Sequence, residues 1–139
     1  MTAIKTPNPT TQLLFIAHSA IGNAILNAAR GILGELPLPV VLLNIEDDTP
    51  VETINQQLKH YLTTDNHDWL ILVDLYGATP SNIALSFTTP EHVQMVSGLN
   101  LPMVLKVMNY AHLPLKELAQ KALTGGKNGI IDCRTARTA

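Results

Sequence analysis

Two side chains that could carry out chemistry follow directly on short apolar runs of the sequence. His18 comes after Leu13–Ala17, and Asp74 comes after Trp69–Val73. A carboxylate beside a histidine can accept the Nδ1–H of the ring, which fixes the tautomer and leaves the Nε2 lone pair free. Such an imidazole is suited to attack phosphorus, because phosphoryl transfer depends mainly on positioning and charge stabilisation. The pair therefore predicts a phosphoryl-accepting histidine, provided that the fold brings the two residues together.

Small and polar residues next to this pair are candidates for binding a phosphoryl group. Ser19 and Thr79 carry hydroxyl groups, and Gly77 lies in a short loop after Asp74. Helices are expected to begin after both apolar runs, and helix N-termini present free backbone N–H groups and the positive end of the helix dipole. Each residue also has a plain structural interpretation: His18 and Thr79 as helix caps, and Asp74 as an acceptor for helix N–H groups.

The elements that must position these residues alternate between strands and helices. Apolar runs at 13–17, 40–43 and 69–73, with a weaker one at 92–97, are typical of buried strands. Apolar residues at helical spacing predict helices at 21–32, at 50–62 after an N-cap at Thr49, from about Ser81, at 101–110 and at 115–123. The expected inward faces consist of Ile21, Ala24, Ile25, Ala28 and Ile32 in the first helix, and Val51, Ile54, Leu58, Tyr61 and Leu62 in the second.

This alternation predicts an α/β domain with an open, mostly parallel, flavodoxin-like sheet, an order beginning 2-1-3-4, and helices on both faces. Thr124-Gly125-Gly126 is predicted to end the last helix, and 129–132 to form a short C-terminal strand. Ligands of such sheets bind at the carboxyl ends of the strands, where the strand order reverses between the first and the third. His18 and Asp74 end those two strands, and their convergence favours a reactive site over two caps.

Length and composition restrict the class of protein. The 139 residues fit one domain, expected at 12–133 between flexible ends at 1–11 and 134–139. A net charge of −2 and few aromatic residues argue against a nucleic-acid partner. The single cysteine, Cys133, excludes an internal disulfide and is typical of a reduced compartment. Residues 1–11 lack the apolar core of a signal peptide, and no apolar run is long enough for membrane insertion, so we expect a cytoplasmic location.

Other groups of ionisable residues are weaker candidates. His60, Asp65, His67 and Asp68 have no recognised ligand spacing and indicate a solvated turn, so we expect no metal site. The acidic run 46–48 indicates a solvated loop away from the reactive pair. No P-loop and no G-x-G-x-x-G motif occurs, so we expect no nucleotide and no other cofactor.

Three segments resemble the IIA component of the mannose-type bacterial phosphotransferase system. The first is His18 with the helix of small residues that follows it. The second is Leu72–Asn82, which is similar to the family's D-x-x-G-G-[ST]-P-x-N loop, and the third is Val96–Met103, which is similar to its G-x-N-[LI]-P-M loop. The resemblance extends over nearly the whole chain. The chain departs from the family pattern in two places: it has Ala17-His18-Ser19 where the family commonly has Thr-His-Gly, and Ala78 replaces the second loop glycine.

The resemblance implies that the histidine phosphocarrier protein HPr phosphorylates His18 on Nε2. It also implies that Asp74 orients the imidazole, that Thr79 lies near the phosphoryl group, and that a separate IIB protein is the acceptor. The family dimerises by exchanging its last strand, which lies antiparallel to the others. This implication agrees with the apolar pair Ile130-Ile131, since a lone terminal strand needs the edge of a sheet.

Two alternative functions belong to other classes. In the first, the phosphorylation state of His18 controls a partner protein without any role in sugar transport. In the second, the chain is a receiver-type regulator phosphorylated on Asp74. Receivers need an acidic pair after the first strand to hold Mg²⁺, and the chain has Ala17-His18-Ser19 there. The sequence therefore disfavours the receiver.

Overall fold

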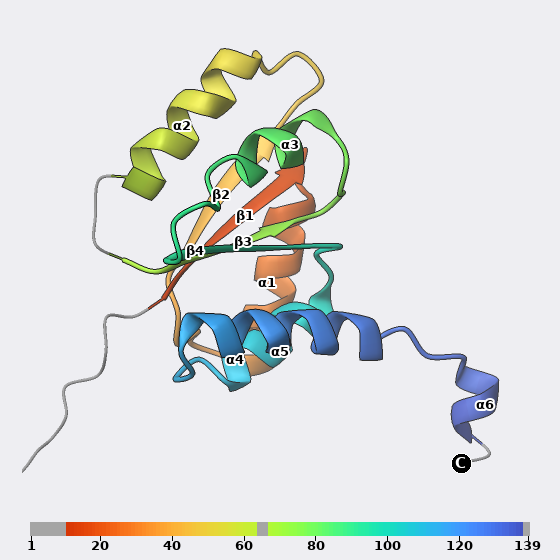
Figure 1. Cartoon of the computed structure of the whole chain (residues 1–139). Helices are drawn as coiled ribbons and strands as arrows, with labels where there is room; N and C mark the ends of the chain where they lie inside the picture. Colours follow the sequence, from red (N-terminus) through yellow and green to blue (C-terminus); the bar gives the residue numbers. More distant parts are fainter. Residues whose placement is uncertain (1–10, 64–66, 138–139) are drawn as a thin grey trace, which may run out of the picture.

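A parallel sheet in the order β2-β1-β3-β4 forms the centre of the computed structural model, which describes residues 11–63 and 67–137 (Figure 1). Its strands are β1 (Gln12–His18), β2 (Val40–Ile45), β3 (Trp69–Val73) and β4 (Val93–Ser97). The five residues of β3 are at most 3% exposed, as expected of a central strand covered on both faces. The predicted strand order is confirmed.

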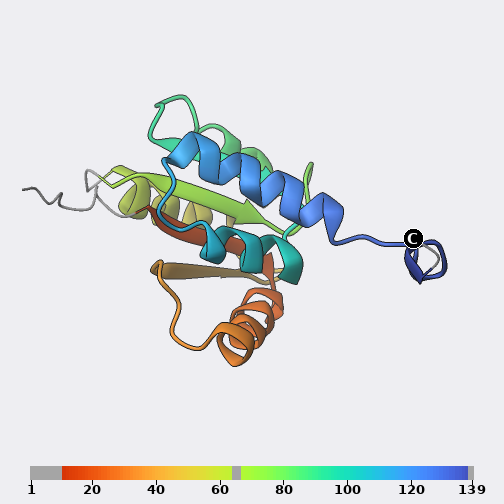
Figure 2. The same ribbon diagram turned by 90° about the horizontal axis from the view of Figure 1, so that it is seen from below.

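Helices cover both faces of the sheet (Figures 1 and 2). One face packs against α1 (Ile21–Leu33), α4 (Leu101–Asn109) and α5 (Leu115–Asn128), and the other against α2 (Val51–Thr63) and α3 (Thr79–Leu85). Neighbouring side chains of a strand point to opposite faces, so Leu70 and Leu72 belong to the first core while Ile71 and Val73 belong to the second.

The buried face of α1 differs from the prediction. Ile21 and Ile32 are exposed, whereas Gly22, Leu26 and Ala29 face the core. A glycine at position 22 allows this close packing, since a Cβ there would lie 3.3 Å from Cδ2 of Leu42. The helix therefore approaches the sheet along its smallest side chains, and two of the larger apolar residues remain outside. In α2, burial of Ile54, Leu58 and Leu62 is confirmed, Tyr61 is partly buried, and Val51 is exposed.

The C-terminal part also departs from the prediction. Helix α5 does not stop at Gly125-Gly126 but continues to Asn128, because these glycines face α4 at close range. A Cβ at Gly125 would lie only 2.5 Å from that of Lys106. Residues 130–132 form no strand in this structure. Helix α6 (Cys133–Arg137) follows, in the segment expected to be a flexible end, and projects from the rest of the chain (Figure 2).

Candidate functional site

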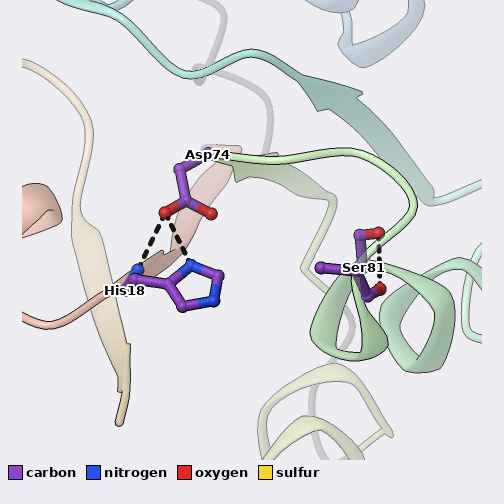
Figure 3. A network of polar contacts seen from close by, with 4 residues as sticks. His18, Asp74 and Ser81 are labelled. Atoms are coloured by element: carbon purple, nitrogen blue, oxygen red, sulfur yellow. Dashed lines mark hydrogen bonds and ion pairs between the residues drawn. The ribbon is translucent and has the colours of Figure 1, made fainter. Parts of the chain in front are cut away.

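His18 and Asp74 meet at the carboxyl ends of two neighbouring strands. His18 is the last residue of β1, and Asp74 follows β3, with its N–H donating to the carbonyl of Ile16 at 3.1 Å. One carboxylate oxygen, Oδ2 of Asp74, accepts from the backbone N–H of His18 at 2.8 Å and lies 3.0 Å from Nδ1 of the ring (Figure 3). The predicted convergence of the two side chains is confirmed.

This contact defines the chemical state of the ring. A carboxylate can only accept hydrogen bonds, so Nδ1 must carry the proton that it shares with Asp74. In the neutral ring Nε2 then holds a lone pair, and this atom points away from the carboxylate (Figure 3). The His18 side chain is 38% exposed and that of Asp74 is 14% exposed. The arrangement combines a partly exposed imidazole with a largely shielded carboxylate on its Nδ1 side.

The sheet topology explains why the site opens here. After β1 the chain turns to α1 on one face of the sheet, and after β3 it turns to α3 on the other face. The two connections diverge, which leaves the ends of β1 and β3 uncovered. Leu75 and Tyr76, in the connection after β3, are exposed.

His18 lines a cleft of about 390 Å³. The other lining residues come from the end of β2, the start of α2 and the start of α3: Ile45, Glu46, Asp47, Thr49, Val51, Ile54, Ala78, Thr79 and Pro80. Thr79, one of the candidates for phosphoryl binding, is thus part of the cleft wall. Ser19 and Gly77, the other candidates for phosphoryl binding, are not among its lining residues.

The acidic loop after β2 is closer to the site than predicted. Glu46 and Asp47 are exposed, as expected of a solvated loop, but both line the cleft with His18. The cause is the register of the sheet, in which His18 pairs with Ile45, so the residues after Ile45 emerge beside the histidine. The predicted strand order contained this information, since it places the second strand next to the first.

The connection from β3 to α3 is held by a serine that the sequence pattern did not indicate. Gly77 has a φ of +89°, and its N–H donates to Oγ of Ser81 at 2.9 Å. Helix α3 begins at Thr79 with Ala78 as its N-cap, so the prediction of Thr79 as the N-cap is wrong. The Gly77 amide is therefore occupied by Ser81.

Ser19 has a strained backbone next to His18. Its φ is +51°, and its N–H donates to the carbonyl of Ile45 at 2.7 Å, which fixes the turn out of β1.

The left-handed conformation costs a non-glycine residue about 1–2 kcal/mol, while glycine adds about 0.5–1 kcal/mol of unfolded-state entropy. We therefore expect Ser19→Gly to raise the free energy of unfolding by up to about 1 kcal/mol in urea denaturation. Ser19→Ala, which keeps the Cβ, is the control and should remain close to wild type. A less stable glycine variant would contradict the assigned strain.

The segment 98–103 has a structural role and does not line the cleft. Gly98 has a φ of +86°, and Asn100 caps α4 by accepting from the N–H of Met103 at 2.8 Å. The Asn100 amide also donates to the carbonyl of Gly126 in α5 at 3.3 Å. This asparagine therefore joins α4 to α5.

Metal binding gains no support from the described chain. Within residues 11–63 and 67–137, no three His, Cys, Asp or Glu side chains lie together in a way that could hold an ion. Of the weak candidates considered above, Asp65 lies outside the described residues.

None of the helices in the described ranges is long and apolar enough to cross a bilayer.

Comparison with known proteins identifies relatives of this chain. The family model described as PTS system fructose IIA component matches residues 12–123. The fructose-specific EIIA component of Bacillus subtilis is 41% identical over 69 residues, which cover 48% of this chain and 46% of the relative. The sorbose-specific EIIA component of Klebsiella pneumoniae is 29% identical over 101 residues, which cover 71% and 73% of the two chains. The match thus spans about half the length of the Bacillus relative and nearly three quarters of the Klebsiella one.

Solved structures agree with the fold. The phosphotransferase system component EIIA from Streptococcus agalactiae superposes with a TM-score of 0.79 at 25% identity, covering 90% of this chain and 98% of that one. The mannose/sorbose-specific IIA subunit from Enterococcus faecalis gives the same TM-score at 24% identity, covering 88% and 93%.

Proposed function

Because this chain belongs to the fructose IIA component family of the phosphotransferase system, we propose that it carries a phosphoryl group on Nε2 of His18. The observation that carries the proposal is the hydrogen-bonded pair: Asp74 holds Nδ1, and Nε2 remains free beside the cleft. Members of this family are phosphotransferase components, and the site supplies the nucleophile that such a component needs.

The transfer is a displacement at phosphorus. The Nε2 lone pair of His18 attacks the phosphoryl group of phosphorylated HPr, and the P–N bond of the donor breaks with its electron pair returning to the donor imidazole. His18 becomes a phosphorylated imidazolium that still carries its Nδ1 proton. Asp74 stabilises this positive ring without taking the proton. We assign to Thr79, which lines the cleft with His18, the donation of its hydroxyl to a phosphoryl oxygen.

The onward step passes the group to a separate IIB protein by the same chemistry in reverse. We place this relay in the cytoplasm, where the single thiol of Cys133 would remain reduced. A purely regulatory role is not favoured, because the curated relatives are named as sugar-specific components.

The proposal is tested by rebuilding the relay with phosphoenolpyruvate, enzyme I, HPr and this chain. We expect radiolabel to reach this chain only when HPr is present, and to be acid-labile and base-stable, as phosphohistidine is. A base-labile label would indicate an acyl phosphate on Asp74, and failure to label would remove the proposed activity.

We further propose a homodimer in which the segment around Ile130-Ile131 takes part. Ile130 is 81% exposed and Ile131 is 57% exposed. In the described sheet β4 is an edge strand, and a hollow of about 310 Å³ lies between it and α5, where Leu123 is also exposed. An apolar segment and an open edge in one chain are complementary between two copies.

We expect the full-length chain to have the mass of a dimer in light scattering, and the chain ending at Asn128 to have that of a monomer. The double variant Ile130→Asp/Ile131→Asp keeps the full length of the chain. It should also weaken the dimer, which separates the loss of the apolar side chains from the loss of length. A full-length monomer at micromolar concentration, or a truncated chain that remains an equally stable dimer, would contradict this interface.

A further inference from the structure

We propose that Ser81 is a positioning residue for phosphoryl transfer: its hydroxyl closes the loop after Asp74 and holds Thr79 in the His18 cleft. The inference rests on the function proposed above, and it assigns a role to a residue that the family's D-x-x-G-G-[ST]-P-x-N pattern leaves open.

Ser81 is a buried polar residue with two defined partners. It is 2% exposed, and its Oγ accepts from the N–H of Gly77 at 2.9 Å and donates to the carbonyl of Ala78 at 3.0 Å. Figure 3 shows it at the start of α3, across the site from the histidine–aspartate pair. One hydroxyl therefore bonds to two successive residues of the loop that connects Asp74 to Thr79.

The local sequence explains why Ser81 takes this part. Helix α3 has Ala78 at its N-cap, and alanine has no side-chain acceptor for the helix N–H groups. The N3 residue can instead bond back to the loop, as in a capping box. Because Ser81 does so, the Thr79 hydroxyl is not used as a cap. It makes no hydrogen bond to any described residue, and Thr79 lines the cleft with His18.

Loss of the Ser81 hydroxyl would release the loop at its least constrained point. Gly77 has a φ of +89°, which glycine leaves readily for other conformations. The remaining side-chain bond to this residue, from Asn82 Nδ2 to the Gly77 carbonyl, is long at 3.4 Å. The Ala78 carbonyl would keep its bond from the N–H of Asn82 at 3.0 Å, so we expect a small shift of Thr79 relative to Nε2. A displacement of about 1 Å at a reacting group can lower a rate by about 10²-fold.

The test compares Ser81→Ala with Ser86→Ala in phosphoryl transfer from phosphorylated HPr. Ser86 also donates a hydroxyl hydrogen bond, to the Ile83 carbonyl at 2.6 Å, but at the far end of the same helix. We expect Ser81→Ala to lower kcat by about 10- to 100-fold with KM within about twofold of wild type. We expect Ser86→Ala to leave both constants near wild type. Equal effects of the two variants on kcat would overturn the proposal.

A double-mutant cycle tests whether Ser81 acts through Thr79. Thr79→Val removes the hydroxyl and keeps the shape, so Ser81→Ala should cost clearly less in that background than in wild type. Additive losses would overturn the link to Thr79.

Should Ser81→Ala fail to fold, Ser81→Cys supplies a weaker partner for Gly77 and should give an intermediate kcat. Wild-type kcat in a folded cysteine variant would count against the role. If wild type itself is not phosphorylated on His18, the proposed function fails. If wild type is phosphorylated and Ser81→Ala transfers normally, only this inference fails.

Discussion

Replacing His18 with alanine should abolish phosphoryl acceptance from HPr while the fold remains intact. The side chain is 38% exposed and lies at the very end of β1, so its removal leaves no cavity in either core. It does remove Nε2, the proposed nucleophile. Radiolabel transferred through enzyme I and HPr is the readout, and circular dichroism monitors the fold.

The matched control is His112→Ala, because His112 is also exposed but lies beside Tyr110, in the connection between α4 and α5. This variant should be labelled like wild type. Undiminished labelling of His18→Ala, with the control also labelled, would mean that a residue other than His18 accepts the phosphoryl group.

Asp74→Asn should retain the fold and slow phosphoryl transfer by about 10²-fold or more. The amide oxygen can still accept from both the ring Nδ1–H and the backbone N–H of His18, as Oδ2 of Asp74 does, but as a neutral acceptor it makes weaker hydrogen bonds than the carboxylate. The amide also lacks the negative charge that stabilises the phosphorylated imidazolium. Single-turnover rates measured by rapid quench would give the size of the loss.

Asp48→Asn provides the control, since Asp48 is exposed in the acidic loop after β2 but does not line the cleft. It removes the same charge without touching His18, and we expect a rate near that of wild type. A wild-type rate in Asp74→Asn would mean that Asp74 serves only to fix the backbone at the end of β1.

The convergence of His18 and Asp74 could be predicted from the sequence, because it depends on where two apolar runs end. Apolar runs fix the strand ends, and the parallel arrangement brings the ends of β1 and β3 together whatever the rest of the chain does. The structure shows the resulting contact between Nδ1 of His18 and Oδ2 of Asp74.

Features that depend on packing between distant segments could not be predicted in the same way. The burial of Gly22 in place of Ile21 follows from the close approach of α1 to Leu42. The continuation of α5 through Gly125 follows from its contact with Lys106 of α4, whereas glycine alone predicts a stop. The bonds of Ser81 follow from the fold of its loop and not from any periodicity.

The most direct test of the phosphohistidine assignment is ¹⁵N and ³¹P NMR of the phosphorylated chain labelled at histidine. We predict one phosphorylated ring, that of His18, with phosphorus coupled to Nε2 and the proton on Nδ1, as the hydrogen bond to Asp74 requires. Phosphorus coupled to Nδ1, or found on a ring other than His18, would contradict the account.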